Sequence, residues 1–256
     1  MAARARDDEF NYYTESKSLG LSIVSILPLV VIYHLGIVQR GHSVRIMAEV
    51  WLEGPLGLIG LQAAHLLNIA VVVALIAVLW RGERAGGPNL LVVLIMVAEG
   101  ALYALALHRG GGALTDAVYS EGRQIFFAAR SAPSPLGAMQ LGPLRLDAPA
   151  ELMLALGAGV YEELVFRLLL IGGGSFALSR LFDWNEGLTL AIAVIVSALL
   201  FSAMHHVGPF GDDFRTYTFL FRAVCGFLLG LIFVLRGFGV AVWTHAVYNA
   251  LIVLTM

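Results

Sequence analysis

Long apolar blocks alternate with short polar stretches along the chain. A helix needs about 20 mainly apolar residues to cross a bilayer. Blocks of this length, or nearly so, lie at 19–38, 56–80, 90–107, 152–172, 188–206, 217–235 and 238–255. The first is too long for the core of a signal peptide, so we expect a retained helix. The pattern predicts an all-α, polytopic transmembrane bundle of about seven spans.

The apolar blocks also divide the chain. Four segments are expected: a polar N-terminus at 1–18, three spans within 19–107, a loop at 108–151 and four spans within 152–256. The loop could contain a short interfacial helix with Phe126 and Phe127 facing lipid. All chemistry must therefore come from the helices or from this loop.

Composition supports a membrane protein. The chain is 59% hydrophobic and 13% charged, whereas soluble domains carry about 25% charged residues. No basic patch suggests a nucleic-acid partner, and Cys225 as the only cysteine excludes an intrachain disulfide. Lys17 is the only lysine among 16 basic residues, an arginine bias that suggests a GC-rich genome. We expect an integral protein of a bacterial inner membrane.

The block at 152–172 contains Glu162, Glu163 and Arg167. A charge at the centre of a span costs about 2.5–3.5 kcal/mol on insertion scales, so such residues usually face a cavity or the bundle interior and are functional. Glu163 precedes Arg167 by four residues, the order that favours an ion pair on one helix face. Glu162 points about 100° away and remains available as a proton acceptor. Alternatively, all three residues only join helices by packing.

Two later spans carry polar side chains at helical spacing. Phe201 lies four residues before His205, and His245 lies four residues before Asn249. A membrane histidine taken alone is more often a hydrogen-bonding residue between helices. Together with Glu162, however, the set supplies a carboxylate, two imidazoles and a carboxamide from three helices. These groups suffice for general-base activation of water and for stabilising an oxyanion.

The order of these motifs resembles a known family. They are Glu162-Glu163-x-x-x-Arg167, Phe201-x-x-x-His205 and His245-x-x-x-Asn249. The pattern resembles the CPBP family, the CAAX protease and bacteriocin-processing (Abi) intramembrane endopeptidases, which include the type II CAAX prenyl endopeptidases. The resemblance covers residues 150–256, and no motif is assigned in the first three spans.

The resemblance implies a role for each matching residue. Glu162 would activate the attacking water with help from His205, while His245 and Asn249 would polarise the scissile carbonyl and stabilise the oxyanion. Three supporting residues would hold the geometry: Glu163, Arg167 and Phe201. The implied enzyme is a peptidase with a water-accessible catalytic cavity inside the membrane.

The resemblance leaves the metal open. Glu162, His205 and His245 could bind zinc, since carboxylate and imidazole are ordinary zinc ligands. The H-E-x-x-H layout of common zinc proteases is absent. We prefer a cofactor-free, glutamate-activated water and keep the zinc-dependent protease as the alternative.

Other classes of function fit less well. A proton-coupled transporter also uses intramembrane Glu and His, but inverted repeats would predict a matching set in the first three spans. A non-catalytic binding or immunity protein could carry the same residues. The expected partners of the peptidase are the lipid bilayer and a membrane-associated protein or peptide substrate.

Overall fold

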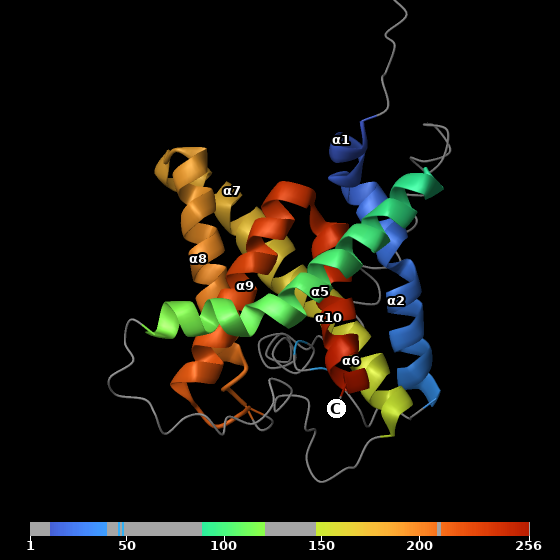
Figure 1. Ribbon diagram of the computed structural model, residues 1–256. Coiled ribbons are helices and arrows are strands. Elements are labelled where there is room, and N and C mark those ends of the chain that lie inside the picture. Colours follow the sequence, from blue (N-terminus) through green and yellow to red (C-terminus); the bar gives the residue numbers. More distant parts are fainter. Residues whose placement is uncertain are drawn as a thin grey trace, which may run out of the picture.

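The predicted all-α architecture is confirmed. The computed structural model describes residues 11–39, 46, 48, 89–120, 147–208 and 211–255. Within these residues the secondary structure is helical and includes no strand (Figure 1). The second predicted span, at 56–80, and the interfacial helix expected around Phe126 lie outside the described residues.

Five described helices are long and apolar enough to cross a membrane. They are α2 (Leu19–Gln39), α5 (Leu90–Ser120), α8 (Glu186–Met204), α9 (Thr216–Arg236) and α10 (Phe238–Thr255). A further rod runs without interruption through α6 (Ala148–Glu163), the π-helix η4 (Leu164–Gly173) and α7 (Gly174–Phe182). A short helix, α1 (Tyr12–Ser16), precedes α2. About seven spans therefore remains a consistent description of the bundle.

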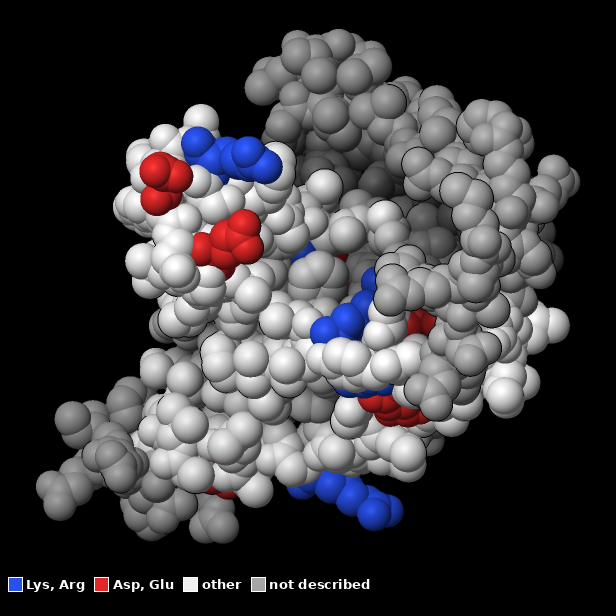
Figure 2. All heavy atoms as spheres, turned by 90° about the horizontal axis from the view of Figure 1, so that it is seen from above, with Lys and Arg blue, Asp and Glu red and all other residues white. Residues whose placement is uncertain are grey.

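The outer surface of these helices is apolar. Val38 on α2 is 69% exposed and Leu102 on α5 is 66% exposed. Such rows of exposed apolar side chains mark contact with lipid rather than water. One group of exposed charges lies at the turn between α7 and α8, where Arg180, Asp183 and Glu186 occur. Figure 2 looks onto this end of the bundle and shows charged side chains in small groups on an otherwise uncharged surface. The protein is an integral membrane protein.

Helix α10 lies at the centre of the bundle (Figure 1). It packs against α5 and α6 and also contacts α2 and α9, while α8 packs against α9, η4 and α7. Helix α10 approaches α6 closely at Gly159, where an added Cβ would lie 2.6 Å from the Ala246 backbone. Small residues permit such close packing of membrane helices. Ala246 follows His245, and Gly159 lies one turn before Glu162. This contact therefore sets which residues of α10 lie beside the two glutamates of α6.

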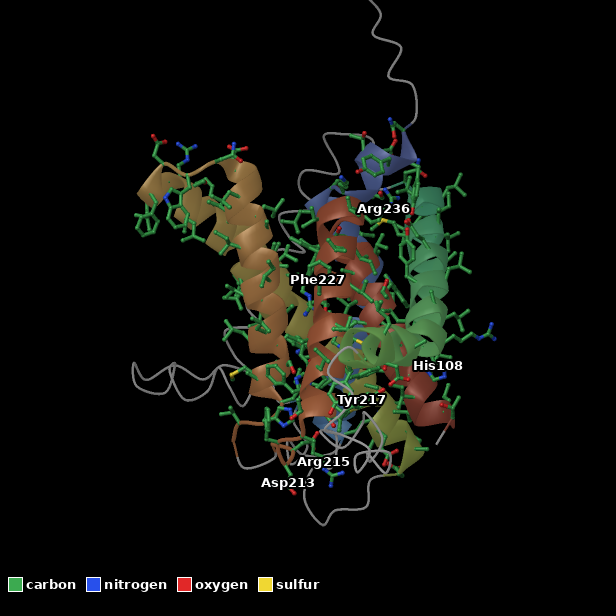
Figure 3. All side chains as sticks on the ribbon, turned by 60° about the vertical axis from the view of Figure 1, so that its left-hand side comes forward. His108, Asp213, Arg215, Tyr217, Phe227 and Arg236 are labelled. Atoms are coloured by element: carbon green, nitrogen blue, oxygen red, sulfur yellow. The ribbon has the colours of Figure 1, made fainter. Side chains whose placement is uncertain are left out.

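Helix α5 extends beyond the expected span. Residues 108–120, predicted as part of a loop, continue the helix to Ser120 despite three consecutive glycines at 110–112. Thr115 Oγ1 donates to Gly111 O at 2.7 Å, and such bonds often bend helices. Figure 3 shows α5 changing direction near His108. The His108 ring meets Tyr248 of α10 at 6.3 Å, so packing maintains a helix that propensity alone disfavours.

Candidate active site

A buried ion pair forms the base of the site. Glu163 and Arg167 are fully buried, and Arg167 Nη1 lies 3.0 Å from Glu163 Oε1. Arg167 Nη2 donates to Gly226 O on α9 at 3.1 Å. Its guanidinium also lies 4.6 Å from the centre of the Phe201 ring on α8. The pair expected from the four-residue spacing is therefore present, and it joins the rod to α8 and α9.

The glutamates lie where α6 passes into the π-helix. Glu163 is the last residue of α6, and Arg167 lies within η4. The wider π-turn is rare in proteins and is frequent at functional sites. Ser197 of α8 donates to Phe166 O within η4 at 2.6 Å. The rod is thus hydrogen-bonded to α8 beside the glutamates, a feature that hydrophobic periodicity did not predict.

Each of the two motif histidines is oriented through its Nδ1 atom. His245 Nδ1 lies 2.8 Å from Glu163 Oε1, and His205 Nδ1 lies 2.6 Å from Phe201 O. A carboxylate and a carbonyl only accept hydrogen bonds, so both Nδ1 atoms donate. The Phe201 ring packs edge-on against both imidazoles, at 4.8 Å from His205 and 5.8 Å from His245.

The two Nε2 atoms converge on one carboxylate oxygen. Glu162 Oε2 lies 3.8 Å from His205 Nε2 and 3.9 Å from His245 Nε2. These separations are too long for direct hydrogen bonds, but one water at about 2.8 Å from each atom can bridge them. Neutral imidazoles with Nδ1–H groups present lone pairs at Nε2. Water has two hydrogens, so a water at this point can donate to Glu162 and to one of the two imidazoles.

A cavity of about 60 Å³ adjoins this cluster. It can hold water, which needs only about 10–15 Å³. Its lining comes from α5, α8, α9 and α10 and comprises Leu107, Phe201, His205, Phe221, Arg222, Cys225, Leu229, His245, Tyr248, Asn249 and Ile252. Glu162 is not part of this lining, but it contacts the two histidines that are.

Asn249 lies on the cavity wall and also connects two helices. Its Nδ2 donates to Ala155 O on α6 at 3.3 Å. An amide nitrogen has two hydrogens, so a single bond to Ala155 leaves Asn249 capable of a second donation. Its place beside His245 in the cavity lining is compatible with the predicted contact to a scissile carbonyl.

The zinc alternative requires ligands that surround one point. Glu162, His205 and His245 lie together, as described above. Among the described residues, however, no group of three or more His, Cys, Asp or Glu side chains is arranged to hold a metal ion. We therefore derive no step through zinc.

Two further charged pairs lie outside the three motifs. Glu99 bonds Arg236 Nε at 2.6 Å and accepts a hydrogen bond from Tyr12. Arg222 pairs with Asp212, at 2.5 Å. An arginine inside an apolar span is itself a signal of function, and Arg222 could have been added to the candidate site on that ground.

The comparisons with known proteins concern the same part of the chain. The family model described as Type II CAAX prenyl endopeptidase Rce1-like matches residues 146–251. No curated protein and no solved structure matches the chain. The matched segment contains all three motifs and supports a CAAX-type intramembrane protease in general. The resemblance carried by the motifs is thus confirmed over residues 146–251, which match the model of the Rce1-like type II CAAX prenyl endopeptidases.

Proposed function

We propose that the protein hydrolyses peptide bonds in membrane-associated protein or peptide tails, using water activated by Glu162 and His205. The observation that carries the proposal is the convergence of two imidazole nitrogens on Glu162 Oε2, at 3.8 and 3.9 Å. A carboxylate and an imidazole around one water are the groups that general-base hydrolysis requires. The neighbouring cavity, which His205 and His245 line, is large enough to supply water to this point.

The reaction begins with a water held between Glu162 and His205. Glu162 takes one proton while the water oxygen attacks the scissile carbonyl carbon, and the carbonyl oxygen becomes an oxyanion. The proton then passes to the amine of the leaving peptide as the C–N bond breaks. The products are a new carboxyl terminus and a new amino terminus, so atoms and charge balance.

His245 and Asn249 would stabilise the oxyanion. Glu163 accepts a hydrogen bond from His245 Nδ1 at 2.8 Å and so orients this ring. A protonated His245 would present Nε2–H to the oxyanion, and the Asn249 amide would supply a further donor. Arg167 balances the charge of Glu163 and keeps that carboxylate in place.

The expected setting is a bacterial inner membrane. Membrane-anchored substrates would reach the site laterally or from the membrane surface. In a bacterial cell, an exported peptide, a sorting tail or a regulatory membrane protein suits this site better than a prenylated tail. A Cys225 nucleophile is not required, because the glutamate and the histidines account for the chemistry.

The proposal is tested by comparing peptide termini in membranes of the native host by mass spectrometry. Three strains carry wild type, Glu162→Gln or the matched control Glu151→Gln at equal abundance. Glu151 lies in the first turn of the same helix, α6. Termini that depend on the protein should vanish with Glu162→Gln and remain with Glu151→Gln. Identical termini in all strains would favour a binding or immunity protein, and loss of cleavage with a chelator would favour zinc.

A further inference from the structure

Tyr248 is a residue of the cavity wall that the proposed mechanism does not use. It lies on α10 between His245 and Asn249, and all three line the cavity. We propose that the Tyr248 hydroxyl hydrogen-bonds a main-chain peptide group of the substrate and so holds the peptide beside His245. The proposal rests on the proposed function, because it concerns the same cavity and the same peptide. It adds to that function a substrate-binding residue outside the three motifs.

The position of Tyr248 on its helix turns it toward the cavity. Four residues of α10 line the cavity at helical spacing, which places them on one helix face: His245, Tyr248, Asn249 and Ile252. The Tyr248 ring meets the ring of His108, at the bend of α5 (Figure 3), edge-on at 6.3 Å. Two cavity-lining residues of α9, Cys225 and Arg222, interact electrostatically with its hydroxyl. The ring is therefore held against α5, while the hydroxyl lies toward the α9 wall of the cavity.

The hydrogen-bonding capacity of the Tyr248 hydroxyl is unused within the described part of the chain. By contrast, Asn249 donates to Ala155 O at 3.3 Å, and His245 donates through Nδ1 to Glu163. A phenol can both donate and accept hydrogen bonds. Water in the cavity can bond the hydroxyl of the free protein. A substrate that displaces this water must offer the hydroxyl a new partner, because a buried polar group without one is costly.

A peptide that enters the cavity has polar groups of its own to satisfy. Hydrocarbon side chains make up much of the lining, namely Leu107, Phe201, Phe221, Leu229 and Ile252. Main-chain N–H and C=O groups without partners are disfavoured in such surroundings at membrane depth. In the proposed mechanism the scissile carbonyl meets His245 and Asn249, so the neighbouring peptide groups need other partners. The hydroxyl of Tyr248, the residue next to Asn249, satisfies one of them.

The first measurement is peptide binding, which requires no cleavage. The probe is a peptide that Glu162→Gln protein in lipid nanodiscs retains from a digest of host membrane proteins. Its Kd is measured for Glu162→Gln alone and with Tyr248→Phe or Tyr13→Phe added. We expect Tyr248→Phe to raise the Kd at least about fivefold, since it leaves a peptide group of the bound probe without its partner. Tyr13→Phe, a change on α1 at a residue that is 49% exposed, should leave the Kd unchanged.

Equal Kd values in all three proteins would overturn the proposal. The melting midpoint of Tyr248→Phe should stay within a few degrees of wild type, because phenylalanine keeps the ring that contacts His108. A weaker Kd with an unchanged midpoint therefore reports on the hydroxyl rather than on the fold.

A second measurement identifies the peptide group that Tyr248 binds. Each main-chain amide of the probe is replaced in turn by an ester, which removes the N–H and weakens the carbonyl as an acceptor. At one position the ester should weaken binding to Glu162→Gln more than it weakens binding to the protein that also carries Tyr248→Phe, the sign of a shared hydrogen bond. Ester effects that add to the effect of Tyr248→Phe at every position would overturn the proposal.

The outcome is separable from that of the proposed function. In a cleaving protein, Tyr248→Phe should raise KM and leave kcat unchanged, as expected for a contact made equally before and in the transition state; a fall in kcat alone would overturn the proposal. Probe binding that depends on Tyr248 in a protein without Glu162-dependent cleavage would refute the peptidase and support the contact. Glu162-dependent cleavage with equal Kd values would support the peptidase and refute the contact.

Discussion

Arg167 has the largest fully buried side chain among the described residues. It is fully buried and neutralises Glu163, which also binds His245. Breaking a buried pair by removing one partner leaves the other charge uncompensated. We expect Arg167→Ala to lower the free energy of unfolding by about 3–5 kcal/mol, measured as a lower melting midpoint and a lower yield of folded protein.

The matched control for this change is Arg180→Ala. Arg180 is an exposed arginine of the same rod, at the end of α7, and its guanidinium lies 5.4 Å from the Phe176 ring. Loss of this exposed contact should leave the melting midpoint within a few degrees of wild type. Equal effects of the two alanine substitutions would contradict a special role for the Glu163–Arg167 pair.

At the residue scale, the sequence predicts contacts within one helix better than contacts between segments. Glu163 and Arg167 lie four residues apart, so helix geometry alone predicts their pairing. Asp212 and Arg222 lie on either side of a helix boundary, and no periodicity predicts that the loop turns back onto α9. The structure shows Glu162 close to His205 and His245, and it places Asn249 with His245 in the cavity lining. The catalytic roles of these four residues remain predictions.

At the element scale, the register between α6 and α10 decides whether the glutamates meet His245. Gly159 permits the contact with Ala246, and a methyl group there would meet backbone atoms at 2.6 Å. We expect Gly159→Ala to destabilise the protein by about 1–3 kcal/mol through overpacking. Cleavage should fall with it, because the Glu163–His245 bond depends on the same register.

Gly174→Ala provides the comparison within the same rod. An added Cβ at Gly174 meets nothing within 4 Å, and alanine favours a helix over glycine by about 1 kcal/mol. The melting midpoint of Gly174→Ala should therefore stay level or rise. A Gly159→Ala protein that is as stable and active as Gly174→Ala would contradict the importance of the α6–α10 contact.

Helix ends are the part of the fold that the sequence predicts least well. The apolar blocks place α2, α8, α9 and α10 within about two residues, because a helix in lipid must satisfy its own backbone. The glycines at 110–112 suggested that α5 ends near 107, but contacts with Tyr217 and Tyr248 hold the helix to Ser120. The π-helix after Glu163 has no equivalent pattern in hydropathy and could not be predicted from it.

At the scale of the whole molecule, a polar cluster fastens the N-terminal helix to the bundle. Tyr12 of α1 donates to Glu99 of α5, which pairs with Arg236 at the end of α9. Arg236 Nη2 also donates to Ser16 at 3.3 Å. These bonds join segments that are far apart in the sequence, and Figure 3 shows Arg236 at the opposite end of the bundle from Asp213 and Arg215.

This cluster predicts a loss of stability at alkaline pH. Burial, followed by the bond to Glu99, raises the pKa of Tyr12 to about 12, compared with about 10 in an unfolded chain. Because folding favours the protonated phenol, its contribution is fully present below about pH 10 and disappears as the pH rises to about 12. The melting midpoint of wild type should fall more over this interval than that of Tyr12→Phe.

Tyr13→Phe is the matched control, since Tyr13 is the adjacent tyrosine of α1 and is 49% exposed. It should keep the alkaline loss of wild type. If Tyr12→Phe and Tyr13→Phe follow the same pH dependence as wild type, the phenol of Tyr12 does not fasten α1 to the bundle.

The central claim is that Glu162 is the base of a hydrolytic reaction. Its most direct test is the cleavage rate of purified protein in lipid nanodiscs, measured with a peptide that spans a cleavage site identified in host membranes. We predict that Glu162→Gln reduces kcat at least about 100-fold with a melting midpoint equal to or above that of wild type, while Glu151→Gln cleaves normally. Cleavage by a folded Glu162→Gln protein at the wild-type rate would contradict the claim.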